Sequence, residues 1–278
     1  MSTESPMQTT EILYEVADHV ATITLNRPEK LNAWTQVMQH EVRAAMEAAG
    51  ADSAVRVILV TGAGRGFCAG ADLDKMKASL EAGRPGTLAR HAAAEDATGI
   101  DANYQQRFSY MLRVPKPTIA AINGPVAGIG LCFVLFTDLR YIVPEAKVTT
   151  AFAKRGLIAE HGMSFMLPRL IGLMPALDLL YTARLIDGTE AARLGLANLL
   201  PAEGFAATVR SIAVDLAQNS SPRSTGVMKR QVYDDMFRDL AESWKVADAE
   251  MYASFESADF KEGVAHYFEK RAPRFTGR

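Results

Sequence analysis

Residues 57–73, VILVTGAGRGFCAGADL, decide the fold class. The apolar, mostly β-branched residues at 57–60 predict a buried strand, and four glycines between 62 and 70 predict a tight turn after it. Asp72 can cap a helix that includes Leu73 and Met76. The stretch therefore predicts a strand, a glycine-rich turn and a helix in succession, which is typical of α/β proteins.

The same succession recurs at 118–136, TIAAINGPVAGIGLCFVLF. Pro115 and Pro117 favour an extended chain into a strand at 118–122, and a second glycine turn opens an all-apolar helix from about 128 to 136. We expect that helix to be buried, because no polar face is left for solvent.

Upstream, β-branched runs at 12–14 and 20–25 predict a hairpin across Asp18 and His19, and a helix capped by Thr35 follows through Gly50. The stretch from Leu80 to Ile100 lacks periodicity and is expected to be a loop or a loosely held helix.

Downstream, the sequence predicts a helix ending near Arg113 and weaker strands at 139–143 and 148–149, then a loop at 156–162 and helices from Met163 onward. Beyond Pro201 only helices are expected, and they cover 204–219, 222–236, 238–256 and 259–271. This pattern predicts an α/β core over residues 1–200 and a helical C-terminal region over residues 201–278.

Composition excludes several classes of protein. With 49% hydrophobic and 22% charged residues in a 278-residue chain, a compact fold is expected rather than disorder. A net charge of -2 and a pI of about 6.2 make nucleic acid a poor default partner. The first ten residues lack the pattern of a secretory signal, and the apolar run at 126–136 is too short to span a membrane. Cys68 and Cys132 are expected to be free thiols in a reducing cytoplasm.

Generic catalytic motifs are absent. The first turn has Phe67 where a G-x-G-x-x-G dinucleotide motif needs its last glycine, and no tyrosine is followed by a lysine four residues later, as short-chain reductases require. Ser164 lacks the closing glycine of a nucleophile elbow. The five histidines are scattered singly, so no metal site is expected.

The two glycine turns suggest a different chemistry. Each leaves backbone N–H groups at the start of a helix, where an oxygen that carries negative charge is favoured. If the N–H groups of Ala71 and Ile129 point at one spot, they form an oxyanion hole that stabilises an enolate. The alternative is that these glycines only permit close packing.

At these residues the chain resembles the crotonase, or enoyl-CoA hydratase/isomerase, family. The resemblance covers nearly the whole chain. The matching stretches are NRP at 26–28, LNA at 31–33, GFCAGADL at 66–73, PKPTIAAINGPVAGIG at 115–130, LPRLIG at 167–172, AARLGL at 191–196, FKEG at 260–263 and FEKR at 268–271.

The resemblance implies a fold with a ββα spiral core and C-terminal helices that assemble a homotrimer or a dimer of trimers. It also implies acyl-CoA thioester substrates, no cofactor beyond the coenzyme A of the substrate, and Ala71 and Ile129 as the oxyanion-hole amides.

The chain departs from the family at the catalytic glutamates. Hydratases of the family carry two, and the aligned residues here are Cys132 and Phe152, neither of which can move a proton from water at neutral pH. Glu160 could replace the missing glutamates. The chain around it resembles the segment of peroxisomal-type 3-enoyl to 2-enoyl-CoA isomerases that contains the glutamate that moves the proton. Apolar neighbours at 157–166 would raise the pKa of Glu160. The alternative for Glu160 is a solvated carboxylate, and His161 could either bond it or face water.

By the same resemblance, Arg27 and Lys30 are expected near the phosphates and adenine of CoA, with Tyr267 and Lys270 supplied by a neighbouring subunit. Each of them could equally be a solvated surface residue. The remaining expected substrate contacts are Ala33, Ala69, Asp72, Leu73 and Gly128, with Asp72 also capping its helix.

These features favour an enzyme that shifts a double bond in an enoyl-CoA with one glutamate as acid and base. Hydration of an enoyl-CoA, hydrolysis of an acyl-CoA, and acyl-CoA binding without turnover remain the alternatives. Acyl-chain identity and pathway do not follow from the sequence.

Overall fold

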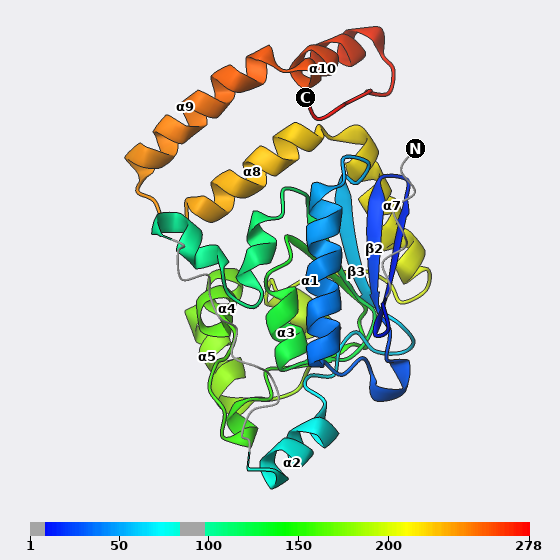
Figure 1. Cartoon of the computed structure of the whole chain (residues 1–278), viewed down its shortest axis with the longest axis vertical. Helices are drawn as coiled ribbons and strands as arrows, with labels where there is room; N and C mark the ends of the chain where they lie inside the picture. The colour runs from blue at the N-terminus through cyan, green and yellow to red at the C-terminus, as the bar shows by residue number, and fades with distance from the viewer. Residues whose placement is uncertain (1–8, 84–97) are drawn as a thin grey trace.

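The computed structural model describes residues 9–83 and 98–278, which form a mixed α/β fold (Figure 1). The main sheet has six strands in the order β1-β2-β3-β4-β6-β9. β1 is antiparallel to β2, and every other pair in this sheet is parallel. Its strands are β1 Ile12–Ala17, β2 Val20–Leu25, β3 Val57–Gly62, β4 Thr118–Ile122, β6 Leu139–Ile142 and β9 Asn198–Leu199.

A smaller sheet has the order β5-β7-β8, with β5 parallel to β7 and β7 antiparallel to β8. Its strands are β5 Val126–Ala127, β7 Lys147–Thr149 and β8 Ile186–Asp187. β5 lies in the second glycine turn, so this sheet supports the chain directly before α3. The two-residue strands β5, β8 and β9 were not predicted.

The predicted hairpin is confirmed. Asp18 and His19 have φ values of 52° and 63°, and left-handed residues at both turn positions match the twist of the flanking strands. Ala17 pairs with Val20 directly across the turn.

The helices before residue 200 also follow the predicted pattern. Thr35 caps α1 by accepting a hydrogen bond from the Met38 N–H at 3.1 Å. α3 is buried at all six positions, as its apolar sequence requires. The segment that ends at Arg113 is the short 3-10 helix η3, and 84–97 lies outside the described residues. The helices are α1 Gln36–Ala51, α2 Leu73–Glu81, η1 Pro28–Lys30, η2 Gly99–Tyr104, η3 Ser109–Arg113, α3 Ile129–Val134, η4 Ala153–Arg155, α4 Met163–Ile171, α5 Leu173–Thr182 and α6 Gly188–Arg193.

Four helices follow, as predicted: α7 Phe205–Asn219, α8 Pro222–Asp234, α9 Leu240–Glu256 and α10 Ala258–Glu269. α7 buries Phe205 and Val209 and lies against the sheet, whereas α9 buries none of its side chains. α9 and α10 project from the body beyond α8 (Figure 1). The boundary at residue 200 remains a prediction. Among the helices of the described ranges, none has both the length and the hydropathy that a membrane crossing requires.

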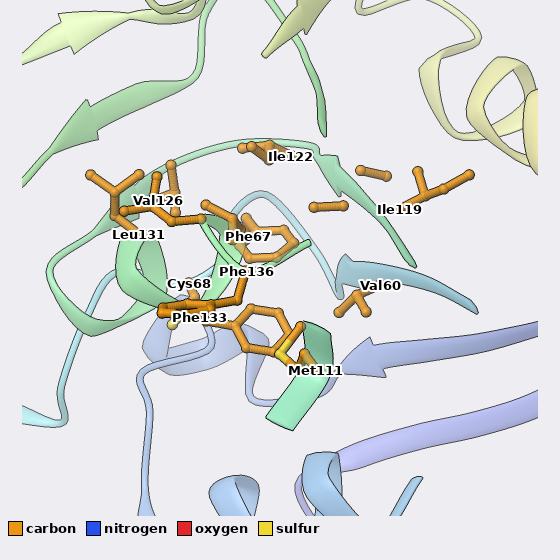
Figure 2. Close-up of a cluster of buried hydrophobic side chains, with 14 of the residues drawn as sticks. Val60, Phe67, Cys68, Met111, Ile119, Ile122, Val126, Leu131, Phe133 and Phe136 are labelled. Carbon is orange, nitrogen blue, oxygen red and sulfur yellow. The ribbon is translucent and has the colours of Figure 1, made fainter. Parts of the chain in front are cut away.

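Aromatic packing fixes the position of α3. Its Phe133 ring lies 5.2 Å from that of Trp34, 5.7 Å from that of Phe108 and 6.4 Å from that of Phe67. Figure 2 shows Phe67, Phe133 and Phe136 within the same apolar cluster. Because aromatic contacts of this kind hold their partners in defined geometry, the start of α3 is held rigidly beside the first glycine turn.

Candidate active site

A cavity of about 1080 Å³ lies where four parts of the chain meet. They are the first glycine turn with α2, the second turn with α3, the segment from 103 to 112, and the segment from 152 to 166. Phe237, between α8 and α9, also lines it. The volume is sufficient for an extended organic ligand.

Direct backbone contacts hold the two glycine turns together. The Ala127 N–H donates to the Cys68 carbonyl at 3.0 Å, and the Cys68 N–H donates to the Pro125 carbonyl at 3.0 Å. Gly130 lies so close that a Cβ there would be 2.7 Å from the Cys68 carbonyl oxygen. The turns converge, as the oxyanion-hole prediction requires.

Both predicted amides line the cavity without a protein acceptor among the described residues. In the parallel bridge between Trp34 and Ala71, the hydrogen bonds are made by Trp34 N–H to Gly70 O (2.7 Å) and by Asp72 N–H to Trp34 O (3.2 Å). This pattern turns the Ala71 N–H away from Trp34. Ile129 is the first residue of α3, so its N–H has no partner within the helix. Both groups can therefore donate to a ligand oxygen.

The glycines of the first turn serve two purposes. At Gly62 a Cβ would come within 2.2 Å of the Gly66 carbonyl, so this part of the turn is closed by packing. The Asn123 amide secures it by donating to the carbonyls of Gly62 and Gly64 at 2.9 and 3.0 Å. Only the later part, from 69 to 71, lines the cavity, so the packing alternative holds for the earlier glycines.

Glu160 lies in the loop before α4 and lines the same cavity. Its carbonyl oxygen accepts the Met163 N–H at 3.0 Å and the Cys132 thiol at 3.5 Å, which fixes the backbone. The side chain is 32% exposed. Partial burial raises the pKa of the carboxyl, and the positive charge of Arg107 opposes that rise. Such a carboxylate is a stronger base than one in water.

His161 lies beside the Glu160 carboxylate. Its Nε2 lies 3.6 Å from the Glu160 Oε2, and its ring meets the Phe108 ring edge-on at 6.0 Å. Burial, aided by Arg107, lowers the pKa of His161 to about 4, so the imidazole is neutral near pH 7. His161 and Glu160 both line the cavity.

Cys132 and Phe152 occupy the positions where the resemblance places the two glutamates of hydratases. Cys132 is fully buried, and burial together with the charge of Glu160 raises the pKa of its thiol far above the ordinary value. Phe152 is also buried and lines the cavity. Neither residue can transfer a proton at neutral pH.

Arg27 and Asp72 bind each other. The guanidinium donates to the Asp72 carboxylate at 2.8 Å and to the Ala33 carbonyl at 2.6 Å, and the Lys75 N–H donates to Asp72 at 3.3 Å. Burial alone would favour the neutral acid, but the bond from Arg27 lowers the pKa of Asp72. These contacts confirm that Asp72 supports the start of α2. Arg27, Ala33 and Asp72 do not line the cavity, and their contacts with substrate remain predictions.

The other residues expected near the nucleotide of CoA lie apart from the cavity. Lys30 pairs with Asp74 at 2.7 Å on the surface. α10 and α2 lie at opposite ends of the molecule (Figure 1). Tyr267, in the last turn of α10, and Lys270, directly after it, do not line the cavity in the described protomer. Their expected role therefore requires a neighbouring subunit.

The expected contacts Ala69, Leu73 and Gly128 do line the cavity. Arg107, whose charge acts on both Glu160 and His161, was not predicted from the sequence. Three aromatic residues of the lining, Tyr104, Phe108 and Phe237, were not predicted either, whereas Phe165 was expected beside Glu160 and Phe136 in the buried helix. These residues carry no motif, and only the apolar spacing around 104–112 indicated burial.

Comparison with known proteins identifies the family. Residues 15–278 match the family model described as enoyl-CoA hydratase/isomerase. The chain belongs to this family. A probable enoyl-CoA hydratase of Rhodobacter capsulatus is 33% identical over 96% of this chain and 98% of its own length. The 1,2-epoxyphenylacetyl-CoA isomerase of Escherichia coli is 30% identical over 96% of this chain and 98% of its own.

Solved structures of the family confirm the predicted crotonase fold. A probable enoyl-CoA hydratase/isomerase from Mycobacterium abscessus superposes with a TM-score of 0.84 at 28% identity, covering 97% of this chain and 100% of that one. An enoyl-CoA hydratase from Bacillus anthracis gives 0.85 at 28% identity, with the same coverage of both chains. The α/β core with C-terminal helices is thus a fold that this family shares.

Proposed function

We propose that this member of the enoyl-CoA hydratase/isomerase family is an enoyl-CoA isomerase with Glu160 as its single acid and base. One observation carries the proposal: Glu160 lines the same cavity as Ala71 and Ile129. The resemblance adds that Cys132 and Phe152 stand at the two glutamate positions of the family's hydratases. Removal and return of one proton need one carboxylate, whereas activation of water by the family's usual route needs two.

In the proposed reaction, the Glu160 carboxylate removes a proton from C2 of a 3-enoyl thioester. The electron pair moves to the thioester oxygen, and the Ala71 and Ile129 N–H groups stabilise the resulting dienolate. Protonated Glu160 then returns the proton to C4 as the electrons move back, so that the double bond lies between C2 and C3. The carboxylate is regenerated and no water is consumed.

The substrate side of the proposal rests on the resemblance. Coenzyme A enters as part of the substrate and no further cofactor is required. Tyr267 and Lys270 of a neighbouring subunit would complete the nucleotide pocket of a homotrimer or a dimer of trimers. The exposed apolar side chains of α9 and α10, among them Trp244 and Phe268, support such an assembly. The free, buried thiols of Cys68 and Cys132 accord with a cytoplasmic enzyme.

Hydration is the second candidate, because His161 is a second titratable group lining the cavity. With its Nε2 3.6 Å from the Glu160 carboxylate, a neutral imidazole could share a water with that carboxylate. The name of the Rhodobacter relative agrees with hydration and that of the Escherichia relative with isomerisation.

Product identity separates the candidates. The protein is incubated with a 3-enoyl-CoA and, separately, with a 2-enoyl-CoA, and products are analysed by mass spectrometry and ultraviolet absorbance. Isomerisation predicts an unchanged mass with a shifted double bond. A gain of one water indicates a hydratase, release of free CoA a hydrolase, and binding without turnover a carrier; each of these outcomes overturns the proposal.

A further inference from the structure

Part of the cavity wall is rich in aromatic rings, and we call this part the aromatic wall. It is formed by Tyr104, Phe108, Phe136, Phe152, Phe165 and Phe237. These residues come from four separate parts of the chain, and Phe237 is the contribution of the C-terminal region. Ala71 lies directly before α2, whereas Phe237 lies at the junction of α8 and α9, on the other side of α3 and α4 (Figure 1). Because Ala71 and Phe237 line the same cavity, an acyl group held at Ala71 can extend toward Phe237.

Phe237 is the most available ring of this wall. Phe165 already contacts the Arg169 guanidinium, 3.5 Å from its ring centre, and stacks on Phe237 at 5.6 Å with an interplanar angle of 10°. Tyr104 meets Phe237 edge-on at 6.2 Å. Phe237 is nevertheless 40% exposed, so part of its ring remains accessible to a ligand.

A buried carboxylate holds this part of the wall in place. Asp234 accepts hydrogen bonds from the Tyr104 hydroxyl at 2.8 Å, from Arg113 at 3.3 Å and from Arg238 at 3.2 Å. The Phe237 N–H donates to the Asp234 carbonyl at 3.0 Å. One residue thus fixes both rings, Tyr104 through its side chain and Phe237 through its backbone. A wall fixed in this way is preorganised for a ligand of one shape.

We propose that the acyl group of the substrate ends in an aromatic ring and that Phe237 is the residue that selects it. The inference rests on the proposed function and deepens it by naming the substrate class. Aromatic rings gain stacking or edge-to-face energy against one another beyond the apolar area they bury, and a flexible alkyl chain gains none of it. A flexible alkyl chain must also lose rotational freedom when it binds to a rigid wall, whereas an aromatic ring has no such internal freedom to lose.

The test measures binding of two saturated thioesters with equal numbers of acyl carbons, phenylacetyl-CoA and octanoyl-CoA, to the full-length protein by calorimetry. Octanoyl-CoA has the larger apolar area, so burial alone would favour it. We expect phenylacetyl-CoA to bind about fivefold or more tightly, in line with the energy of an aromatic pair. Equal affinities, or tighter binding of octanoyl-CoA, overturn the inference.

The role of Phe237 is tested with Phe237→Leu, which keeps apolar bulk and removes the ring. We expect the preference for phenylacetyl-CoA to fall below about twofold, and Phe237→Tyr to restore it. Phe255→Leu is the matched control, because Phe255 lies on α9 outside the cavity lining, and the preference should persist. A preference unchanged in Phe237→Leu overturns the role of Phe237.

Failure of the proposed function gives a different result. If neither thioester binds, the acyl-CoA site itself is refuted. If both bind equally and a 3-enoyl-CoA is still isomerised, the proposed function stands and the aromatic substrate class is refuted.

Discussion

The thiol of Cys132 donates a hydrogen bond to the carbonyl oxygen of Glu160 at 3.5 Å. Cys132, which the resemblance aligns with one glutamate of the family's hydratases, therefore supports the backbone of Glu160. Its support is positional, because the thiol is fully buried and protonated.

Replacement of Cys132 tests this support. Cys132→Ala removes the donor, and we expect kcat to fall about twofold to tenfold, since one neutral hydrogen bond contributes roughly 0.5–1.5 kcal/mol. Cys132→Ser keeps a donor and should retain most of the activity. Equal loss in the two variants would show that the hydrogen bond does not position Glu160.

Gly130→Ala tests the convergence of the two turns. The new Cβ would lie 2.7 Å from the Cys68 carbonyl oxygen, and backbone cannot yield as a flexible side chain does. The start of α3 must shift and carry the Ile129 N–H with it, so we expect kcat to fall about a hundredfold. Gly263→Ala in α10 is the control, because its nearest contact would be 3.9 Å away. Normal activity in Gly130→Ala would exclude the Ile129 amide from catalysis.

The acid limb of the pH profile tests the charge around Glu160. In the proposed reaction the carboxylate is the active base, so kcat/KM should rise with pH through its pKa, which burial raises and Arg107 lowers. Arg107→Gln removes the opposing charge and should move this limb to higher pH. Arg155→Gln, at another cavity residue, should leave the midpoint in place. A midpoint that stays or falls in Arg107→Gln contradicts the assignment.

His161 should make folding stability depend on pH. Its pKa is about 4 in the folded protein, below the ordinary 6.5, so the folded state favours the neutral ring. The contribution of His161 to the free energy of unfolding is fully present above about pH 6.5. It is lost as pH falls toward 4, because the unfolded protein binds the proton more readily than the folded one. Urea unfolding at several pH values should show a smaller loss in His161→Gln over this window. The same loss in both proteins would show that the imidazole is not desolvated.

Local patterns predicted most of the fold. Strands β3 and β4, helix α1 and the four C-terminal helices follow from apolar periodicity and caps such as Thr35, because these signals act within a few residues. The two-residue strands β5, β8 and β9 are too short for any periodicity and exist through their partners. Tertiary pairing alone creates them.

The residues of the candidate site also fall into two groups, those that lie in local sequence motifs and those that only tertiary packing brings to the cavity. Ala71, Ile129 and Glu160 each lie in a recognisable stretch, so that the sequence alone singled them out, and the structure brings them into one cavity. Their catalytic roles remain predictions. Arg107 and Phe237 could not be predicted, because they lie in segments without a recognisable motif. Only the tertiary packing of those segments brings them to the cavity. The contact between Arg27 and Asp72 joins residues 45 positions apart and is likewise a product of the fold.

The most direct test of the central claim compares the wild-type protein with Glu160→Gln on a 3-enoyl-CoA. We predict that the wild type forms a 2-enoyl-CoA of unchanged mass. Glu160→Gln should be slower by about 10²–10⁴-fold, with thioester affinity preserved within about twofold. Isomerisation at the wild-type rate in Glu160→Gln would contradict the assignment of Glu160 as the acid and base.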